Sequence, residues 1–598
     1  MNEKPKSIWK KSWTGLHWLR AWLMVVAATF FTVLIVTLFI PGGPRSLSDW
    51  WPALVFTLLV SVVVATAFVG LWAFTRCFFC WRHIKRSLFV LACFATLVAL
   101  FYAEEDWRGW HAWNQFKHEW EAKGEHFNMA SVAPAPVPDD QNFALTPIAF
   151  TSYGQLLTRD GKRIPHEQRD TNFVVRMQMS IAHDYNDPTN GFGNWEKGKF
   201  TNLEAWQRYY RDLAAKTNEF AVPVQPQSPA ADVLLALGKY NSVIEELRAA
   251  SRLLYSRFPL EYTNESPASI WLPHLAPLKN CARVLQLRSL AELQSGQPDK
   301  ALDDVKLALQ LTDKIHTEPF LISHLVRIVM LQIALQPIWE GLAEHKWSDQ
   351  QLGALDAELA KFNFLPDYML SMDGEMGCQG GEMDRLRRYP EQIKNLSGIG
   401  AGDGNHNDPS LPGKIVSHLI PGGWFYQNQL RCTRMMIEFY IPVADVSQGT
   451  FSPALVRRGD AALTADSKTA SPFNLLERLM LPGLGNAAKK FAWSQASMDL
   501  ARVAIALERY RLAHGEFPES LDALAPQFIG KIPHDIINGQ PLHYHRDPPS
   551  PGSGAASGQF VLYSVGWNER DDDGEVGLGN NGAVDISQGD WVWRYPAK

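Results

Sequence analysis

The chain has 598 residues, of which 46% are hydrophobic and 20% charged, with 22 Trp and 31 Phe. This composition excludes a small disulfide-stapled module and a globally disordered chain. Residues 1–103 carry ten Lys or Arg against two acidic residues, a net +8. Of the 57 basic and 62 acidic residues in total, this leaves 47 basic and 60 acidic, a net −13, for residues 104–598. Because phosphate neutralisation needs positive charge, nucleic-acid binding is not expected of that part.

Three uncharged, strongly apolar runs occupy residues 21–40, 50–75 and 87–103. A helix rises about 1.5 Å per residue, so about twenty residues cross the roughly 30 Å of hydrocarbon in a bilayer. The first run is too long for the core of a cleaved signal peptide, and further runs follow it. We therefore predict a membrane domain of three transmembrane helices over residues 1–103.

Lysine and arginine are distributed asymmetrically around these runs. Nine lie before the first run or between the second and third, whereas only Arg45 lies between the first and second. Under the positive-inside rule the two basic segments are cytoplasmic, so the chain leaves the third run on the opposite side. We expect the bulk of the chain to be extracytoplasmic, as in a protein of the bacterial inner membrane.

Residues 104–145 are expected to form a stalk helix and a linker. Aromatic residues three or four positions apart over residues 107–123 predict the helix. The alternate prolines of residues 133–140 exclude helix and predict an extended, polyproline-type segment. A domain boundary is therefore expected at this linker.

Residues 146–372 show helical periodicity almost throughout and predict a helical domain. Two of its helices are expected over residues 282–315, with a break at Ser-Gly-Gln-Pro. This pair resembles a tetratricopeptide hairpin, with Leu285 and Ser289 at the apolar and small positions and Glu292 where that family usually has an aromatic residue. A single repeat-like pair favours a helical bundle over a solenoid, which needs about three or more stacked repeats.

Residues 373–424 are rich in Gly, Asp, Asn and Pro, which predicts a loop region. Further helices packing on the helical domain are expected over residues 425–490. Residues 491–598 are predicted to be a small α+β module. It would consist of a helix over residues 491–514, with Gly515 as its C-cap, followed by strand candidates at 541–545, 559–565 and 591–594.

Several short runs of this module occur in a characteristic order: residues 506–518, 532–533, 539–544 and 563–566, then Asp585-Ile586 and Trp591. In this order they resemble the globular head of the major pseudopilins of type II secretion. That head is a helix packed on a short sheet, with a calcium ion in the acidic loop after the Ser-x-Gly strand. The resemblance implies a pilin-like head with Ca²⁺ ligands at Asp571, Asp573 and Asp585. The whole chain also resembles large bacterial membrane proteins of unassigned role.

The acidic loop also permits calcium on its own chemistry. Residues 571–575 read Asp-Asp-Asp-Gly-Glu, which places several hard oxygens beside a bend. Ca²⁺ takes six to eight such oxygens, and extracytoplasmic sites bind with dissociation constants of about 10⁻⁴ to 10⁻³ M. The alternative interpretation is an acidic turn that is simply solvated.

Six cysteines are too few for a disulfide framework in so long a chain. Cys77 and Cys80 form a C-x-x-C in an apolar context, which predicts packing rather than a redox or metal site. The separated residues Cys281, Cys378 and Cys432 allow one disulfide and require none.

The catalytic motifs sought in the sequence are His-Glu-x-x-His, a Gly-x-Ser-x-Gly elbow, a phosphate-binding loop and a dinucleotide fingerprint, and none occurs. His543 and His545 alternate on a predicted strand and would share one face, which permits either a metal pair or an exposed polar face. Glu375, Glu382 and Asp384 lie in the predicted loop and could do acid–base chemistry only if held at a fixed separation.

The fold class predicted is multi-domain: three transmembrane helices, a mainly α-helical domain and a small α+β pilin-like head. The leading hypothesis is a non-enzymatic inner-membrane protein that binds envelope proteins, in the setting of secretion or pilus-like assemblies. Its expected partners are the bilayer and envelope or secretion-system proteins. The alternatives are a component of the secretion apparatus itself, or a membrane-anchored envelope hydrolase with its cleft between the helical domain and residues 373–424.

Overall fold

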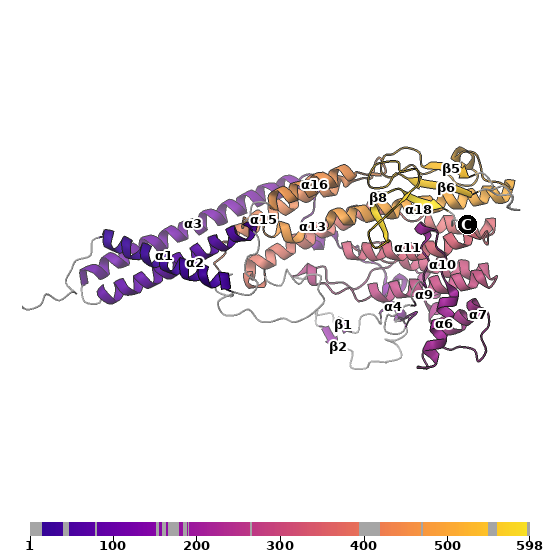
Figure 1. Cartoon of the computed structure of the whole chain (residues 1–598), viewed down its shortest axis with the longest axis horizontal. Coiled ribbons are helices and arrows are strands. Elements are labelled where there is room, and N and C mark those ends of the chain that lie inside the picture. Colours follow the sequence, from indigo (N-terminus) through magenta and orange to yellow (C-terminus); the bar gives the residue numbers. More distant parts are fainter. Residues whose placement is uncertain are drawn as a thin grey trace, which may run out of the picture. The chain divides into compact units, whose positions relative to one another are not determined.

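The protein is mostly helical, with small antiparallel sheets near its C-terminus (Figure 1). The computed structural model forms two compact units. Residues 1–110, 421–424 and 470–472 make the first unit, and the other residues make the second. The structure describes residues 15–39, 47–77, 81–150, 155–157, 163–165, 177, 179–182, 188, 191–263, 266–393, 419–467, 471–547 and 559–594.

The first unit contains the three predicted apolar helices, α1 (Gly15–Phe39), α2 (Leu47–Cys77) and the first part of α3 (Trp81–Glu121). Small residues on α2, including Ser61 and Ala65, are fully buried, and α1 and α2 pack side by side (Figure 1). The Trp22 indole Nε1 donates to Thr66 Oγ1 at 3.1 Å. In a lipid environment the hydrophobic effect does not drive helices together, and small residues allow the close packing that holds them in contact.

These three helices are each long and apolar enough to cross a membrane, which confirms the predicted spans as apolar helices and indicates a membrane protein. Among the described residues one further helix meets the same criterion, α11 (Leu321–Ala343), but 61% of its apolar window is buried within the protein. It carries Arg327, whose Nη2 lies 3.0 Å from Asp313 Oδ1. We therefore interpret α11 as a core helix of the second unit.

Helix α3 is one uninterrupted helix of 41 residues, about 60 Å long. The predicted third span and the predicted stalk helix are therefore continuous. In the second unit Trp113 meets Phe127 edge to face, with ring centroids 5.7 Å apart, and both rings are buried. The proline-rich segment that follows is extended at Ala133, as predicted, but its last two residues begin a short 3-10 helix, Asp139–Gln141.

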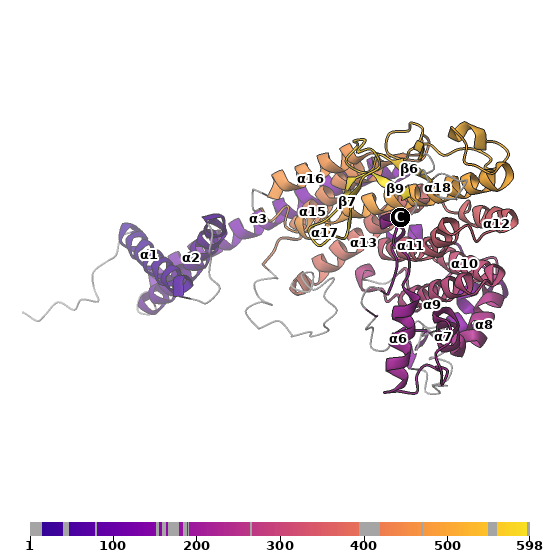
Figure 2. The same ribbon diagram turned by 45° about the vertical axis from the view of Figure 1, so that its right-hand side comes forward.

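A layered set of helices forms the centre of the second unit, where α9 packs on α7, α10 and α11 (Figure 2). The predicted helical pair is confirmed as α9 and α10, and Gly296 in the intervening turn has φ +68°. This left-handed conformation suits glycine, and proline suits the first turn of the next helix. The bounds of the set are α6 (Leu203–Ala214), α7 (Pro229–Leu237), α8 (Asn241–Ser251), α9 (Leu275–Gln294), α10 (Pro298–Asp313) and α12 (Asp349–Leu359).

The loop predicted over residues 373–424 is wrong for its first part, because α13 (Phe364–Arg388) continues as helix to residue 388. Three of its glycines, Gly374, Gly377 and Gly380, lie where backbone from another segment packs against the helix. A methyl group on Gly374 would overlap the carbonyl oxygen of Pro319, and one on Gly380 would lie 2.7 Å from that of Phe127. These glycines, which made the segment look like a loop in the sequence, allow close packing of the helix against other backbone. Residues 394–418 lie outside the described part.

Helix α15 (Gly422–Met435) starts three residues before the region of further helices predicted from residue 425, and it continues as a π-helical turn, Met436–Tyr440. Helix α16 (Pro453–Ser467) lies within residues 425–490, where further helices were predicted. Short elements complete this region: β3 (Ala444–Asp445), β4 (Thr450–Phe451) and α17 (Glu477–Met480). The four-residue helix α4 (Pro147–Phe150) and the hairpin of β1 (Gln155–Leu157) and β2 (Arg163–Pro165) precede the helical layers.

The C-terminal helix and strands are close to their predicted positions. Helix α18 (Leu484–His514) begins seven residues before the predicted start and ends at Gly515, which has φ +85° and donates its N–H to Arg511 O. Strands β5 (His543–Asp547), β6 (Gln559–Ser564) and β9 (Trp591–Arg594) form an antiparallel sheet in the order β5-β6-β9. Strands β7 (Val576–Leu578) and β8 (Val584–Gly589) form a separate hairpin.

Helix α18 packs against the sheet and also against α11, α12 and α13 (Figure 2). Phe491 on α18 is fully buried and meets Tyr368 of α13 edge to face at 5.3 Å between ring centroids. The helix on which the sheet packs is therefore also a central helix of the second unit.

Candidate functional site

The acidic loop lies between β6 and β7, and its first acid is bound to neighbouring side chains. Asp571 Oδ1 accepts hydrogen bonds from the Tyr563 hydroxyl and the Asp573 N–H, both at 3.0 Å. Its Oδ2 lies 3.3 Å from His543 Nδ1. The N–H of Asp573, and then the Tyr563 hydroxyl, lower the pKa of Asp571. Asp573 itself is exposed and has φ +56°.

The residue that organises this loop is Asp590, which the sequence analysis did not select. Asp590 is buried, and its carboxylate accepts the N–H of Gly574 at 2.7 Å and the N–H of Asp572 at 3.1 Å. Burial raises its pKa to about 6, against the lowering effect of these two N–H groups. In the sequence, Asp590 is marked only by its position directly before the strand predicted at residues 591–594.

Asp585, the third expected calcium ligand, is engaged within the β8 strand instead. Its Oδ1 accepts the Ser587 N–H at 2.9 Å, and its Oδ2 accepts Gln588 Nε2 at 3.2 Å. The Ser587 N–H is the main cause of its lowered pKa. Within the described residues, no group of three His, Cys, Asp or Glu side chains is placed to hold a metal ion. The arrangement therefore does not present Asp571, Asp573 and Asp585 as a ligand set, and calcium binding stays a prediction.

His543 and His545 share a face of β5, as their alternation indicated. The His543 ring stacks on Tyr563 with centroids 4.8 Å apart, and His545 meets the same ring edge to face at 6.1 Å. In the antiparallel pairing of β5 with β6, Tyr563 lies directly across from His543. This arrangement produces an aromatic and acidic surface around Asp571.

The three acids expected in the loop of residues 373–424 lie on α13, because that segment is helical. Glu382 is buried; it accepts the Ser266 hydroxyl and pairs with Arg385. Desolvation raises the pKa of Glu375 to about 7. Asp384 pairs with Arg387 at 3.6 Å. These acids are thus placed by one helix, and Glu382 already has protein partners.

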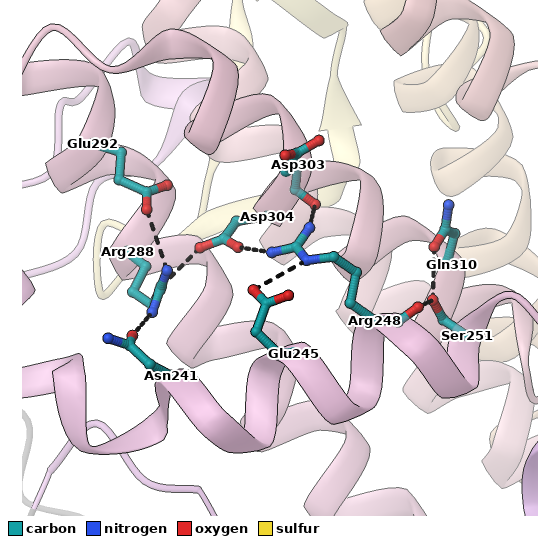
Figure 3. A network of polar contacts seen from close by, with 9 residues as sticks. All are labelled: Asn241, Glu245, Arg248, Ser251, Arg288, Glu292, Asp303, Asp304 and Gln310. Carbon is teal, nitrogen blue, oxygen red and sulfur yellow. Dashed lines mark hydrogen bonds and ion pairs between the residues drawn. The ribbon is translucent and has the colours of Figure 1, made fainter.

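A polar cluster in the second unit joins α8, α9 and α10 (Figure 3). Asp304 is buried and binds two guanidinium groups, at 2.8 Å to Arg288 Nε and 2.9 Å to Arg248 Nη2. Arg288 also reaches Glu292 at 3.3 Å. Burial, followed by the charge of Asp304, raises the pKa of Glu292 to about 8. Burial raises the pKa of Asp304 as well, and the two guanidinium groups of Arg288 and Arg248 act against that rise.

This cluster gives a physical role to the residue that departs from the tetratricopeptide pattern. Glu292 lies on α9 and pairs with Arg288, and through Arg288 it belongs to the polar cluster that joins α8, α9 and α10 (Figure 3). Arg248 additionally donates to the Asp303 carbonyl at 2.9 Å, and Ser251 donates to Gln310 at 2.9 Å. The buried Asp304 is enclosed by protein partners, whereas Glu245 and Asp303 at the edge of the cluster are exposed. This is the arrangement of an ion cluster that joins helices.

The described cysteines include no disulfide: Cys93, Cys281, Cys378 and Cys432 are all free thiols. Cys281 is fully buried, and burial raises its pKa to about 12. No family model, no curated protein and no solved structure matches the chain.

Proposed function

We propose that this chain is a non-enzymatic protein anchored in the bacterial inner membrane, whose extracytoplasmic second unit binds other envelope proteins. The observation that carries the proposal is the three apolar N-terminal helices followed by a large, densely packed unit. The resemblance to pseudopilin heads supplies the setting, which is secretion or a pilus-like assembly. The nine-to-one distribution of basic residues around the spans supports the orientation.

The polar clusters of the second unit support binding rather than catalysis. Asp304 is satisfied by two guanidinium groups and Asp590 by two backbone N–H groups. Groups that are used in this way hold the fold together, and they are not poised to touch a substrate. Protein contact is instead supported by exposed apolar side chains, such as Ile322 and Val329, which lie two turns apart on α11 and are 53% and 45% exposed.

Site-specific photo-crosslinking in intact cells tests the proposed association. A photoreactive amino acid at position 322 or 329 should produce defined adducts with envelope proteins. Val224, which is 92% exposed, provides the control position and should produce none above background. Equal labelling at the three positions would contradict the proposed binding surface. A periplasm-active reporter fused after Lys598 tests the orientation separately, and activity of a cytosolic reporter there would reverse it.

A further inference from the structure

The start of α15 is bonded to α3 immediately after the apolar part of that helix. The N–H of Gly423 donates to Asp106 Oδ1 at 2.6 Å, across 317 residues of sequence. The indole Nε1 of Trp424 donates to Glu105 Oε2 at 3.1 Å. Asp106 therefore caps the N-terminus of α15, where a helix has unsatisfied N–H groups and a partial positive charge.

Two glycines bring the backbones of these segments together. A methyl group on Gly109 of α3 would overlap the carbonyl oxygen of Gly423, and a methyl group on Gly423 would overlap the carbonyl oxygen of Glu105. Only glycine permits an approach this close. Residues 421–424 accordingly belong to the same compact unit as the apolar helices, although they follow them by about three hundred residues in the chain.

The level of this contact along α3 corresponds to the lipid headgroups. The last uncharged residue of the third apolar run is Ala103, so residues 105–109 lie two to six residues beyond it. At 1.5 Å per residue, this places them about 3–9 Å past the end of the apolar run. The headgroup layer on each side of the hydrocarbon is about 5–8 Å thick. Gly423 and Trp424 are bonded to α3 at this depth.

Apolar and aromatic side chains are exposed on residues close in sequence to the two segments that make this contact. Trp107 is 63% exposed and Trp110 is 50% exposed on α3. Leu419, four residues before Gly423, is 62% exposed. Tryptophan is enriched at the boundary between lipid and water because its ring is apolar and its N–H is polar.

We propose that residues 419–424 form a second attachment to the bilayer, inserted among the phospholipid headgroups of the leaflet from which α3 emerges. Gly423 and Trp424 are bonded to α3, and Leu419, which precedes residues 421–424 by only two residues in the chain, reaches the same lipid layer. This inference rests on the membrane-spanning assignment of the three apolar helices and is independent of any protein partner. The surface binds lipid by burying apolar area at the interface.

Lipid crosslinking of the full chain in nanodiscs of phosphatidylcholine and phosphatidylglycerol tests this attachment. A photoreactive amino acid at position 419 should produce lipid adducts detected by mass spectrometry, at least tenfold above those from position 254. Leu254 is a matched control, since it is a leucine of the second unit that is 73% exposed. Equal adduct yields at the two positions, or adducts at 419 with protein alone, would overturn the proposal.

A second pair of variants tests whether the glycine contact positions the attachment. Gly423→Val should lower the lipid adduct at position 419 severalfold, because the new side chain collides with the α3 backbone. Gly530→Val should leave it unchanged, because nothing lies within 4 Å of a methyl group at that position. A probe at position 107 reports that the nanodisc contains correctly inserted α3 in both variants. An unchanged adduct in Gly423→Val would overturn the role of the contact.

Discussion

Removing the carboxylate of Asp304 should loosen the junction of α8, α9 and α10. Its two oxygens bind Arg288 and Arg248 at 2.8 and 2.9 Å, and the side chain is 1% exposed. Asp304→Ala would leave the guanidinium groups of Arg288 and Arg248, whose side chains are only 14% and 21% exposed, without their shared buried partner. Breaking a buried ion pair from one side costs about 3–5 kcal/mol. Because two cations lose the same partner, we expect the upper part of this range.

Hydrogen exchange of the full chain in nanodiscs measures this loss locally. Each 1.36 kcal/mol is a factor of ten in an opening equilibrium, so the upper part of this range predicts that amides of α9 and α10 exchange about 10³- to 5 × 10³-fold faster in Asp304→Ala. Lys123→Ala is the matched control, since Lys123 and Glu119 form an exposed pair at 2.8 Å. Loss of such a pair costs about 0.5 kcal/mol or less, roughly a twofold change.

A result in which Asp304→Ala changes exchange no more than Lys123→Ala would refute this reasoning. It would mean that Arg288 and Arg248 find other partners or water without cost. Arg248→Ala in the Asp304→Ala background distinguishes the outcomes further. If the unpaired cations cause the loss, removal of one of them should recover part of it, and the two changes should not be additive.

Further predictions concern pH, packing and the acidic loop. Because the pKa of Glu292 is raised from 4.5 to about 8, the folded state binds the extra proton and stability should fall as pH rises between these values; Glu292→Gln should flatten that fall in thermal melts. Gly374→Val should lower the melting temperature by several degrees through its overlap with the Pro319 backbone, whereas Gly353→Ala should not. Asp590→Ala should cost about 2–4 kcal/mol and speed amide exchange at residues 572–574, because two N–H groups lose a charged acceptor. If the calcium expectation holds, 5 mM Ca²⁺ should stabilise the full chain by about 1 kcal/mol for a dissociation constant of about 10⁻³ M, relative to EGTA, and an unchanged melt would remove it.

Local chemistry made several elements predictable. The apolar runs of residues 1–103 could be recognised by length alone, since a helix is the form that satisfies backbone groups in lipid. The break between α9 and α10 follows from Gly296, which has a positive φ, and from proline at the start of α10. The end of α18 at Gly515 and the strand at residues 591–594 follow from equally local preferences.

The error at α13 has a tertiary cause. Gly374, Gly377 and Gly380 lower helix propensity, but in the folded chain each faces backbone from a distant segment. Helix propensity depends only on local sequence, whereas these glycines are required by contacts with distant segments, whose positions the sequence alone does not reveal. The burial of α11, which is apolar enough to resemble a membrane span, was equally a matter of what packs around it.

The candidate site shows the same division. The sequence identified the acidic loop and Asp571, because clustered acids are visible in one dimension. It did not identify Asp590, which binds the loop backbone from sixteen and eighteen residues away. It also grouped Asp585 with the loop, whereas β8 engages that carboxylate with Ser587 and Gln588.

The sequence by itself determined that the N-terminal region consists of membrane-length apolar helices and that the rest of the chain is acidic and largely helical, because length, hydropathy and charge are sums over residues. Only the tertiary structure decided which charges are paired inside, which glycines are contacts rather than turns, and that Gly423 returns to α3 across 317 residues. These depend on distances between segments, and a hydrogen bond or a close backbone approach exists only once both segments are in place.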